Sequence, residues 1–283
     1  MSIVGKIKIT TSQAEKLQLG SRKRRSPYLE KCCLLIASNQ SYQRGEEDLE
    51  KLTGIKVSHS TLQRMVVKEE WSEIEVSEEI EEISLDGGMV RLRTPLKESS
   101  EWREYKAINI NNHLNLAFFK DNESLLSWLN SQPLAKPLSC LGDGHDGVWN
   151  IFAQVGKSEE REEILDWYHL MENLHKVTGA KGKINRVKNH LWWGEVGKAL
   201  SLLKKSELRG ADRFSQYLKK HEKRIINYGQ KNLEGETIGS GAVESLVKQI
   251  GLRVKISGAQ WSRENVPQIL RLRCAYLNGV LTA

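Results

Sequence analysis

The chain has 283 residues, of which 39% are hydrophobic and 28% charged, and its formal net charge is +7. This length predicts a main domain and a smaller one, with the composition of an ordinary globular protein. The sequence has no run of about 18 apolar residues and no apolar signal-peptide core, which argues against a membrane or secreted protein. Its four cysteines include no C-x-x-C pair, which argues against a zinc ribbon and a redox pair. We therefore expect a cytoplasmic protein with free thiols.

The charges are unevenly distributed along the chain. Residues 1–27 hold seven Lys/Arg and one acid, and from residue 176 onward basic residues outnumber acids by 21 to 8. Basic regions attract phosphate backbones, although a helical surface that faces solvent has a similar composition. Between them, residues 68–82 hold eight Glu and one Lys, which is typical of a linker or a solvated edge.

Three helices are predicted near the N-terminus. The first covers residues 26–37 with Ser26 as its N-cap, the second covers residues 41–55, and the third covers residues 61–71 with Ser60 as its N-cap. The second and third are separated by a short turn. This order fits a helix-turn-helix motif, and a plain three-helix bundle fits it as well.

We interpret residues 1–75 as a DNA-binding region, because the basic arm precedes the three helices. In a helix-turn-helix motif the N-terminal part of the last helix contacts the bases. The side chains there, which we predict to contact DNA, are His59, Ser60, Thr61, Gln63 and Arg64.

The pattern changes to strands after the acidic run. EEISLDGG is a short apolar strand that ends at Asp86, and MVRLRT, EWREYKAINI and HLNLAFF continue an antiparallel set. A helix over residues 121–132 and a second apolar strand, PLSCLG, lead to Asp143. The segment GVWNIFAQV is helical, and REEILDWYHLMENLHKV begins as a strand and becomes a helix. This mixed order predicts an α/β fold with an RNase H-like core.

The rest of the chain reads as helical. Residues from 179 to about 236 are basic and helical, which predicts an all-helical insertion into the catalytic domain, residues 76–283. The segment TIGSGAVESLVKQIGLRVK then begins with glycines and continues as a helix that carries Glu244. A last helix is expected within residues 261–281.

Three acids form the candidate catalytic and metal-binding site: Asp86, Asp143 and Glu244. The first two directly follow apolar strands and precede glycine, and the third follows a G-x-G turn. Neighbouring carboxylates repel one another and bind cations, so we predict a two-metal site for Mg²⁺ or Mn²⁺. Each signal is weak alone, because Asp-Gly is most often a turn, and Asp146 competes with Asp143 as the second acid.

Four segments carry a specific resemblance: SLDGGMVRLR, CLGDGHDGVWNI, ILDWYHLMENL and IGSGAVESLVKQIGLRVKISGAQWS, which run through residues 84–262. With PYLEKCCLLIASNQSYQRGEEDLEKLTGIKVSHSTLQRMV nearer the N-terminus, the sequence resembles DDE-type transposases, in particular the Kra-type family of bacterial insertion sequences. The resemblance implies that Asp86, Asp143 and Glu244 are the catalytic triad. Two features depart from the family: His145 stands where small residues are usual, and the N-terminal region is short.

The resemblance also implies roles for residues around the triad. Asp166 and His169 correspond to a pair beside the active site in related transposases, although a helix cap and an ordinary histidine explain them equally well. Contacts to the transposon end are implied for Lys248, Arg253, Lys255 and Trp261, with core packing as the alternative for Trp261.

The function expected from these features is transposition. The enzyme would cleave DNA at the transposon ends with a metal-activated water and then join the freed 3′-OH to target DNA. The expected partner is double-stranded DNA, both the terminal inverted repeats and the target, bound by a homo-oligomer. Two alternatives stay open: an RNase H-like nuclease such as a junction resolvase, which would cut without joining, and a non-catalytic DNA-binding regulator derived from a transposase.

Overall fold

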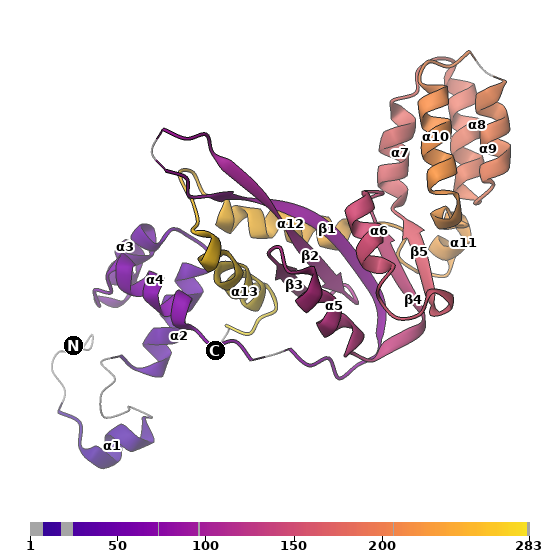
Figure 1. Ribbon diagram of the computed structural model, residues 1–283. Helices are drawn as coiled ribbons and strands as arrows, with labels where there is room; N and C mark the ends of the chain where they lie inside the picture. Colours follow the sequence, from indigo (N-terminus) through magenta and orange to yellow (C-terminus); the bar gives the residue numbers. More distant parts are fainter. Residues whose placement is uncertain (1–7, 18–24, 73, 96, 206, 282–283) are drawn as a thin grey trace.

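A five-stranded mixed sheet forms the centre of the protein (Figure 1). The structure is a computed structural model that describes residues 8–17, 25–72, 74–95, 97–205 and 207–281, so most of the basic N-terminal arm lies outside the described residues. The strands are β1 (Ile80–Leu92), β2 (Glu101–Ile110), β3 (Leu114–Phe118), β4 (Leu134–Gly142) and β5 (Arg161–Leu165). Their order is β3-β2-β1-β4-β5; β1 pairs antiparallel with β2 and parallel with β4, which is itself parallel to β5. The predicted mixed α/β class is confirmed.

β1 is one continuous strand, so the prediction of two strands separated at the glycine pair is wrong. β4 stops pairing at Gly142, opposite Leu85, but β1 continues beside β2 as far as Leu92. A Cβ atom at Gly88 would lie only 2.1 Å from the Tyr105 ring. The glycine therefore admits a neighbouring aromatic side chain and does not make a turn.

Helices pack on the sheet in two separate cores. One core joins the sheet to α5 (Asn122–Asn130), α6 (Asp146–Phe152) and the helices that follow β5. The other lies between the β1–β2 ladder and the two C-terminal helices, α12 (Gly241–Val254) and α13 (Val266–Leu277). No helix of the described residues has the length and apolarity needed to cross a membrane.

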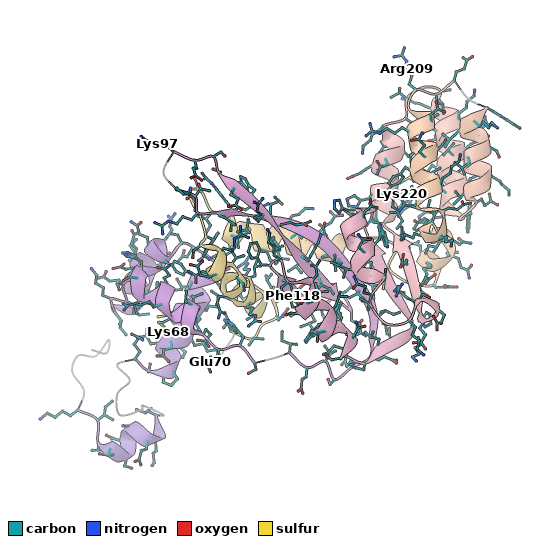
Figure 2. The ribbon with its side chains drawn as sticks, in the orientation of Figure 1. Lys68, Glu70, Lys97, Phe118, Arg209 and Lys220 are labelled. Carbon is teal, nitrogen blue, oxygen red and sulfur yellow. The ribbon has the colours of Figure 1, made fainter. Side chains whose placement is uncertain are left out.

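The stretch predicted as a helical insertion does form helices. They are α8 (Lys181–Trp192), α9 (Val196–Lys204), α10 (Ala211–Lys220) and α11 (Tyr228–Leu233), preceded by α7 (Trp167–His175). Together they form a bundle that stands beyond β5, away from the rest of the sheet (Figure 1). Figure 2 shows Arg209 at the far end of the bundle and Lys220 at the end nearer the sheet. Short 3₁₀ turns at Ser158–Glu160, Glu222–Arg224 and Arg263–Asn265 complete the chain.

The N-terminal region consists of α1 (Thr11–Lys16), α2 (Pro27–Ala37), α3 (Tyr42–Thr53) and α4 (His59–Lys68). Ser26 caps α2 as predicted, with its Oγ accepting from the Leu29 N–H at 3.2 Å. The prediction of Ser60 as the cap of α4 is wrong. The helix begins two residues earlier, at His59, with Ser58 as N-cap, and the carboxylate of Glu46 accepts the free His59 N–H at 2.7 Å.

Two buried arginines fasten this region to the C-terminal helices. The Arg253 Nε donates to the carbonyl of Ala37 at 2.6 Å, and a nitrogen of Arg273 donates to the carbonyl of Ser38 at 3.1 Å. These carbonyls end α2, where backbone acceptors lack helical partners. The α2 helix is therefore held at its C-terminal end by residues more than 200 positions away in the chain.

The described residues of the acidic run between α4 and β1 form neither helix nor strand, in agreement with its prediction as a linker or edge. The run is nevertheless attached to the rest of the protein. The Trp71 indole donates to Gln268 Oε1 at 3.1 Å, and the Trp128 indole donates to the carbonyl of Ile74 at 2.9 Å. These bonds fix its path along the C-terminal and α5 helices.

Candidate active site

The sheet places Asp86 and Asp143 side by side. The preceding residues, Leu85 and Gly142, are partners in the last rung of the parallel β1–β4 ladder. Asp143 lies just past the end of β4 as predicted, whereas Asp86 lies within β1, beyond the point where β4 stops. The two acids therefore occupy the same level of neighbouring strands. α12 packs across β1 and β2 and carries Glu244 in its first turn.

The carboxylates of these three residues influence one another. Burial raises the pKa of Asp86 most, and the negative charges of Asp143 and Glu244 raise it further, while a hydrogen bond from the Gly87 N–H to Asp86 Oδ1 at 2.6 Å opposes this. A half-buried acid beside two others is destabilised as an anion and stabilised by a cation. Carboxylate oxygens are the ligands that Mg²⁺ and Mn²⁺ prefer, so this donor set fits the predicted divalent metal.

A tighter cluster lies next to these acids. Among the described residues, Asp166, His169 and Glu244 are the group whose candidate ligand atoms all lie within 4.8 Å of one another. Asp86 and Asp143 are not part of that close group. Which residues would hold a metal therefore depends on what Asp166 and His169 already bind.

Asp166 is fully buried and engaged by protein donors. As the N-cap of α7 it accepts from the His169 N–H at 2.7 Å, and its other oxygen accepts from the backbone N–H and, at 2.7 Å, the hydroxyl of Ser240. Burial alone would raise the pKa of Asp166, but these hydrogen bonds outweigh it and lower the pKa. The helix-cap interpretation is confirmed, and the cap also ties the end of β5 to the turn before α12.

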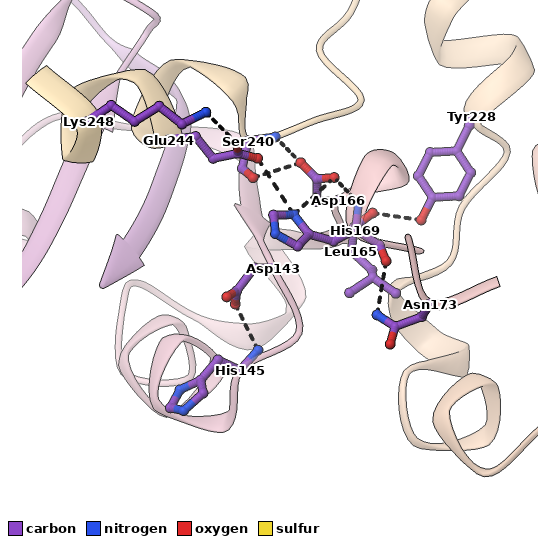
Figure 3. A network of polar contacts seen from close by, with 10 residues as sticks. All are labelled: Asp143, His145, Leu165, Asp166, His169, Asn173, Tyr228, Ser240, Glu244 and Lys248. Atoms are coloured by element: carbon purple, nitrogen blue, oxygen red, sulfur yellow. Dashed lines mark hydrogen bonds and ion pairs between the residues drawn. The ribbon is translucent and has the colours of Figure 1, made fainter. Parts of the chain in front are cut away.

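His169 lies between two acids. Its Nδ1 is 3.4 Å from Asp166 Oδ1 and 3.7 Å from Glu244 Oε1 (Figure 3). The carboxylate of Asp166 raises the pKa of His169 to about 9, with Glu244 adding to the effect. His169 thus links Asp166, which is already engaged by protein donors, to Glu244.

The loop after β4 favours Asp143 over Asp146 as the second acid. Asp143 Oδ1 accepts from the His145 N–H at 2.8 Å, and the His145 ring in turn caps α6 by accepting from the Gly147 N–H at 3.2 Å. Asp146 is exposed and pairs with Lys220 of α10 at 2.5 Å. It is bound to the bundle, whereas Asp143 influences the pKa of Asp86.

Neither a scan against protein-family models nor a search of curated proteins finds a match for this chain.

Two predicted DNA contacts are corrected, because the side chains are buried. Arg253 is 2% exposed, and its guanidinium lies over the rings of Tyr42 and Trp261, at 5.1 and 4.9 Å from their centroids. Trp261 is 8% exposed and donates its indole N–H to the carbonyl of Val254 at 2.9 Å. Both residues pack the N-terminal region against α12, so the alternative of core packing holds for Trp261.

The other predicted DNA contacts are accessible. Ser60, Gln63 and Arg64 are exposed on α4, and Thr61 is partly buried. Lys248 and Lys255 are exposed, and the Lys248 Nζ lies 3.4 Å from Glu244 Oε2. Lys248 therefore places a cation at the edge of the acidic site.

Sequence reasoning missed Ser240. Its hydroxyl and backbone N–H both bind Asp166, and the neighbouring Gly239 approaches the Tyr168 ring so closely that a Cβ atom there would lie 2.6 Å from it. A Gly-Ser-Gly run directly before a helix indicates a close backbone approach. That signal predicts a tight turn, but it does not name the acid bound there.

Proposed function

We propose that this chain is a DDE-type transposase with an RNase H-like core. The observation that carries the proposal is the placement of the three acids. Asp86 and Asp143 follow the same rung of two parallel strands, and α12 brings Glu244 to them. The order β1-β2-β3-α5-β4-α6-β5 also matches the order expected of such a core. An α3-turn-α4 unit with an exposed polar face and a basic bundle supply surfaces for DNA.

In this proposal each part of the site has a chemical task. Asp86, Asp143 and Glu244 would hold divalent cations, which when bound lower the pKa of an attacking water and stabilise the leaving oxygen of a phosphodiester. Asp166 and His169 orient Glu244 through the contacts described above. Lys248 neutralises phosphate charge next to the acids, and the exposed face of α4 contacts the transposon end. Terminal inverted repeats and target DNA are the proposed partners, bound by a homo-oligomer.

Strand cleavage on duplexes that end in the inverted repeats flanking the gene tests this proposal. With Mg²⁺ or Mn²⁺, the full chain is expected to nick the repeat end and leave a 3′-OH. Asp86→Asn, Asp143→Asn and Glu244→Gln should abolish nicking and retain DNA binding. Asp146→Asn is the matched control, since it removes an acid from the same loop without touching the three carboxylates.

The outcomes separate the alternatives. Wild-type cleavage by Asp86→Asn or Glu244→Gln would refute the assignment. Nicking without joining of the repeat end to a supercoiled plasmid would indicate a nuclease. DNA binding without any metal-dependent cleavage would indicate a non-catalytic regulator.

A further inference from the structure

The helical bundle touches the loop that carries Asp143. Gly144, the residue after this acid, has a φ of +95°, and a Cβ atom there would lie 2.8 Å from Tyr217 Oη and 3.6 Å from His221 Nε2. Both side chains come from the C-terminal half of α10 and the residue that follows it. The tyrosine hydroxyl therefore packs closely against the Gly144 turn, where it has no hydrogen-bond partner among the described residues.

The ring of His221 packs against the ring of Tyr217. His221 is 1% exposed, its ring centroid lies 4.7 Å from that of Tyr217 and 6.3 Å from that of Trp149, and neither ring nitrogen has a hydrogen-bond partner among the described residues. Burial lowers the pKa of His221 to about 4, with the charges of Arg224 and Lys220 adding to the effect. At neutral pH the His221 ring is uncharged, and its packing restricts the position of the Tyr217 ring.

The hydroxyl of Tyr217 also lies near the acids of both parallel strands. Burial raises the pKa of Tyr217 most, and the charges of Asp143 and Asp166 raise it further. The bundle is anchored around this point: Tyr228 Oη donates to the carbonyl of Leu165 at 2.7 Å. The position of Tyr217 is therefore fixed relative to the ends of β4 and β5, where Asp143 and Asp166 begin their loops.

We propose that Tyr217 is a positioning residue for the metal site: its hydroxyl packs against the Gly144 turn and so limits the directions that the Asp143 carboxylate can take. The helical bundle thereby completes a site whose three acids all lie outside it. This inference rests on the proposed function, because it takes Asp143 to be a metal ligand. Residues that orient metal ligands are commonly as important for affinity as the ligands themselves.

Mn²⁺ binding to the full chain, measured from the electron paramagnetic resonance signal of free Mn²⁺, tests the inference without relying on activity. Tyr217→Phe keeps the ring and removes only the atom that touches the Gly144 turn. We expect the Kd for Mn²⁺ to rise by about tenfold, the lower end of the effect of losing a residue that orients a metal ligand. The Mn²⁺ concentration for half-maximal strand cleavage should rise by the same factor, with the maximal rate restored at saturating metal.

Lys220→Ala is the matched control. It removes a different link between α10 and the same loop, the ion pair with Asp146, and should leave the Kd for Mn²⁺ unchanged. Equal weakening by both variants would show that docking of the whole bundle matters and would overturn the role of Tyr217. An unchanged Kd in Tyr217→Phe would overturn it as well.

Asp143→Asn distinguishes this inference from the proposed function. If it loses Mn²⁺ binding and Tyr217→Phe does not, the role of Tyr217 alone is refuted. If it binds Mn²⁺ as wild type does, the metal site of the proposed function is wrong. Far-ultraviolet circular dichroism and the Tm of each variant show that the fold is retained.

Discussion

Asp166→Asn should destabilise the protein more than a change of one atom would lead one to expect. Asp166 accepts three hydrogen bonds at a fully buried position, one from the His169 N–H and two from Ser240. Asparagine has one acceptor oxygen, and it is a good helix N-cap, so we expect that oxygen to stay with His169. The amide NH₂ then faces the Ser240 N–H, which leaves a buried donor without an acceptor.

The expected cost follows from this geometry. A buried unsatisfied N–H costs about 1–3 kcal/mol, and loss of the charge on the remaining bond adds about 1 kcal/mol, so the free energy of unfolding should fall by about 2–4 kcal/mol. Urea denaturation followed by circular dichroism measures it. Ser240→Ala is the matched control, because it removes the hydroxyl donor alone and should cost about 1 kcal/mol. If Asp166→Asn cost no more than this control, the reasoning about the unpaired donor would be refuted.

Three further predictions concern other parts of the protein. Arg253→Met should lower the free energy of unfolding by about 1–3 kcal/mol, because the carbonyl of Ala37 loses its buried donor. It should leave the salt dependence of the proposed DNA binding unchanged, and a smaller salt slope would restore Arg253 as a DNA contact. Lys248→Ala should reduce that slope by about one and weaken binding to all sequences alike, as filter binding at several salt concentrations would show. His221 has a pKa near 6.5 when unfolded and about 4 when folded, so between these values only the unfolded chain gains a proton and stability falls as the pH falls. Lowering the pH from 7.5 to 5 should therefore cost wild type about 2 kcal/mol more than His221→Phe, and an equal loss in both proteins would contradict the buried neutral ring.

Much of the fold could be predicted because local patterns and the fold agree. The cap at Ser26, the strand-to-helix change after Leu165 and the helices of residues 179–236 all follow from residue spacing. The break predicted after Asp86 failed for a reason that lies far away in sequence. A glycine is needed at position 88 because the ring of Tyr105 on the next strand occupies the space of a side chain there. In the sequence, a glycine required by close packing cannot be distinguished from a glycine that makes a turn.

The candidate site, too, could be predicted only in part. The three acids could be selected because each follows a recognisable strand or glycine turn. The burial of Arg253 could not be predicted, because its partner, Ala37, is 216 residues away. Nothing in the local sequence distinguishes a buried arginine from one that binds phosphate. The link from Ser240 to Asp166 spans 74 residues and was hidden for the same reason.

The two arginine contacts to the end of α2 have a consequence for the order in which the chain folds during its synthesis. The helices of residues 27–68 are synthesised before the groups that bind the carbonyls of Ala37 and Ser38, which follow 216 and 235 residues later. The first helices can form on their own, since their contacts with one another are local. Their attachment to the C-terminal helices must wait until Arg253 and Arg273 have been made, so the nascent chain carries α4 without these anchors until then.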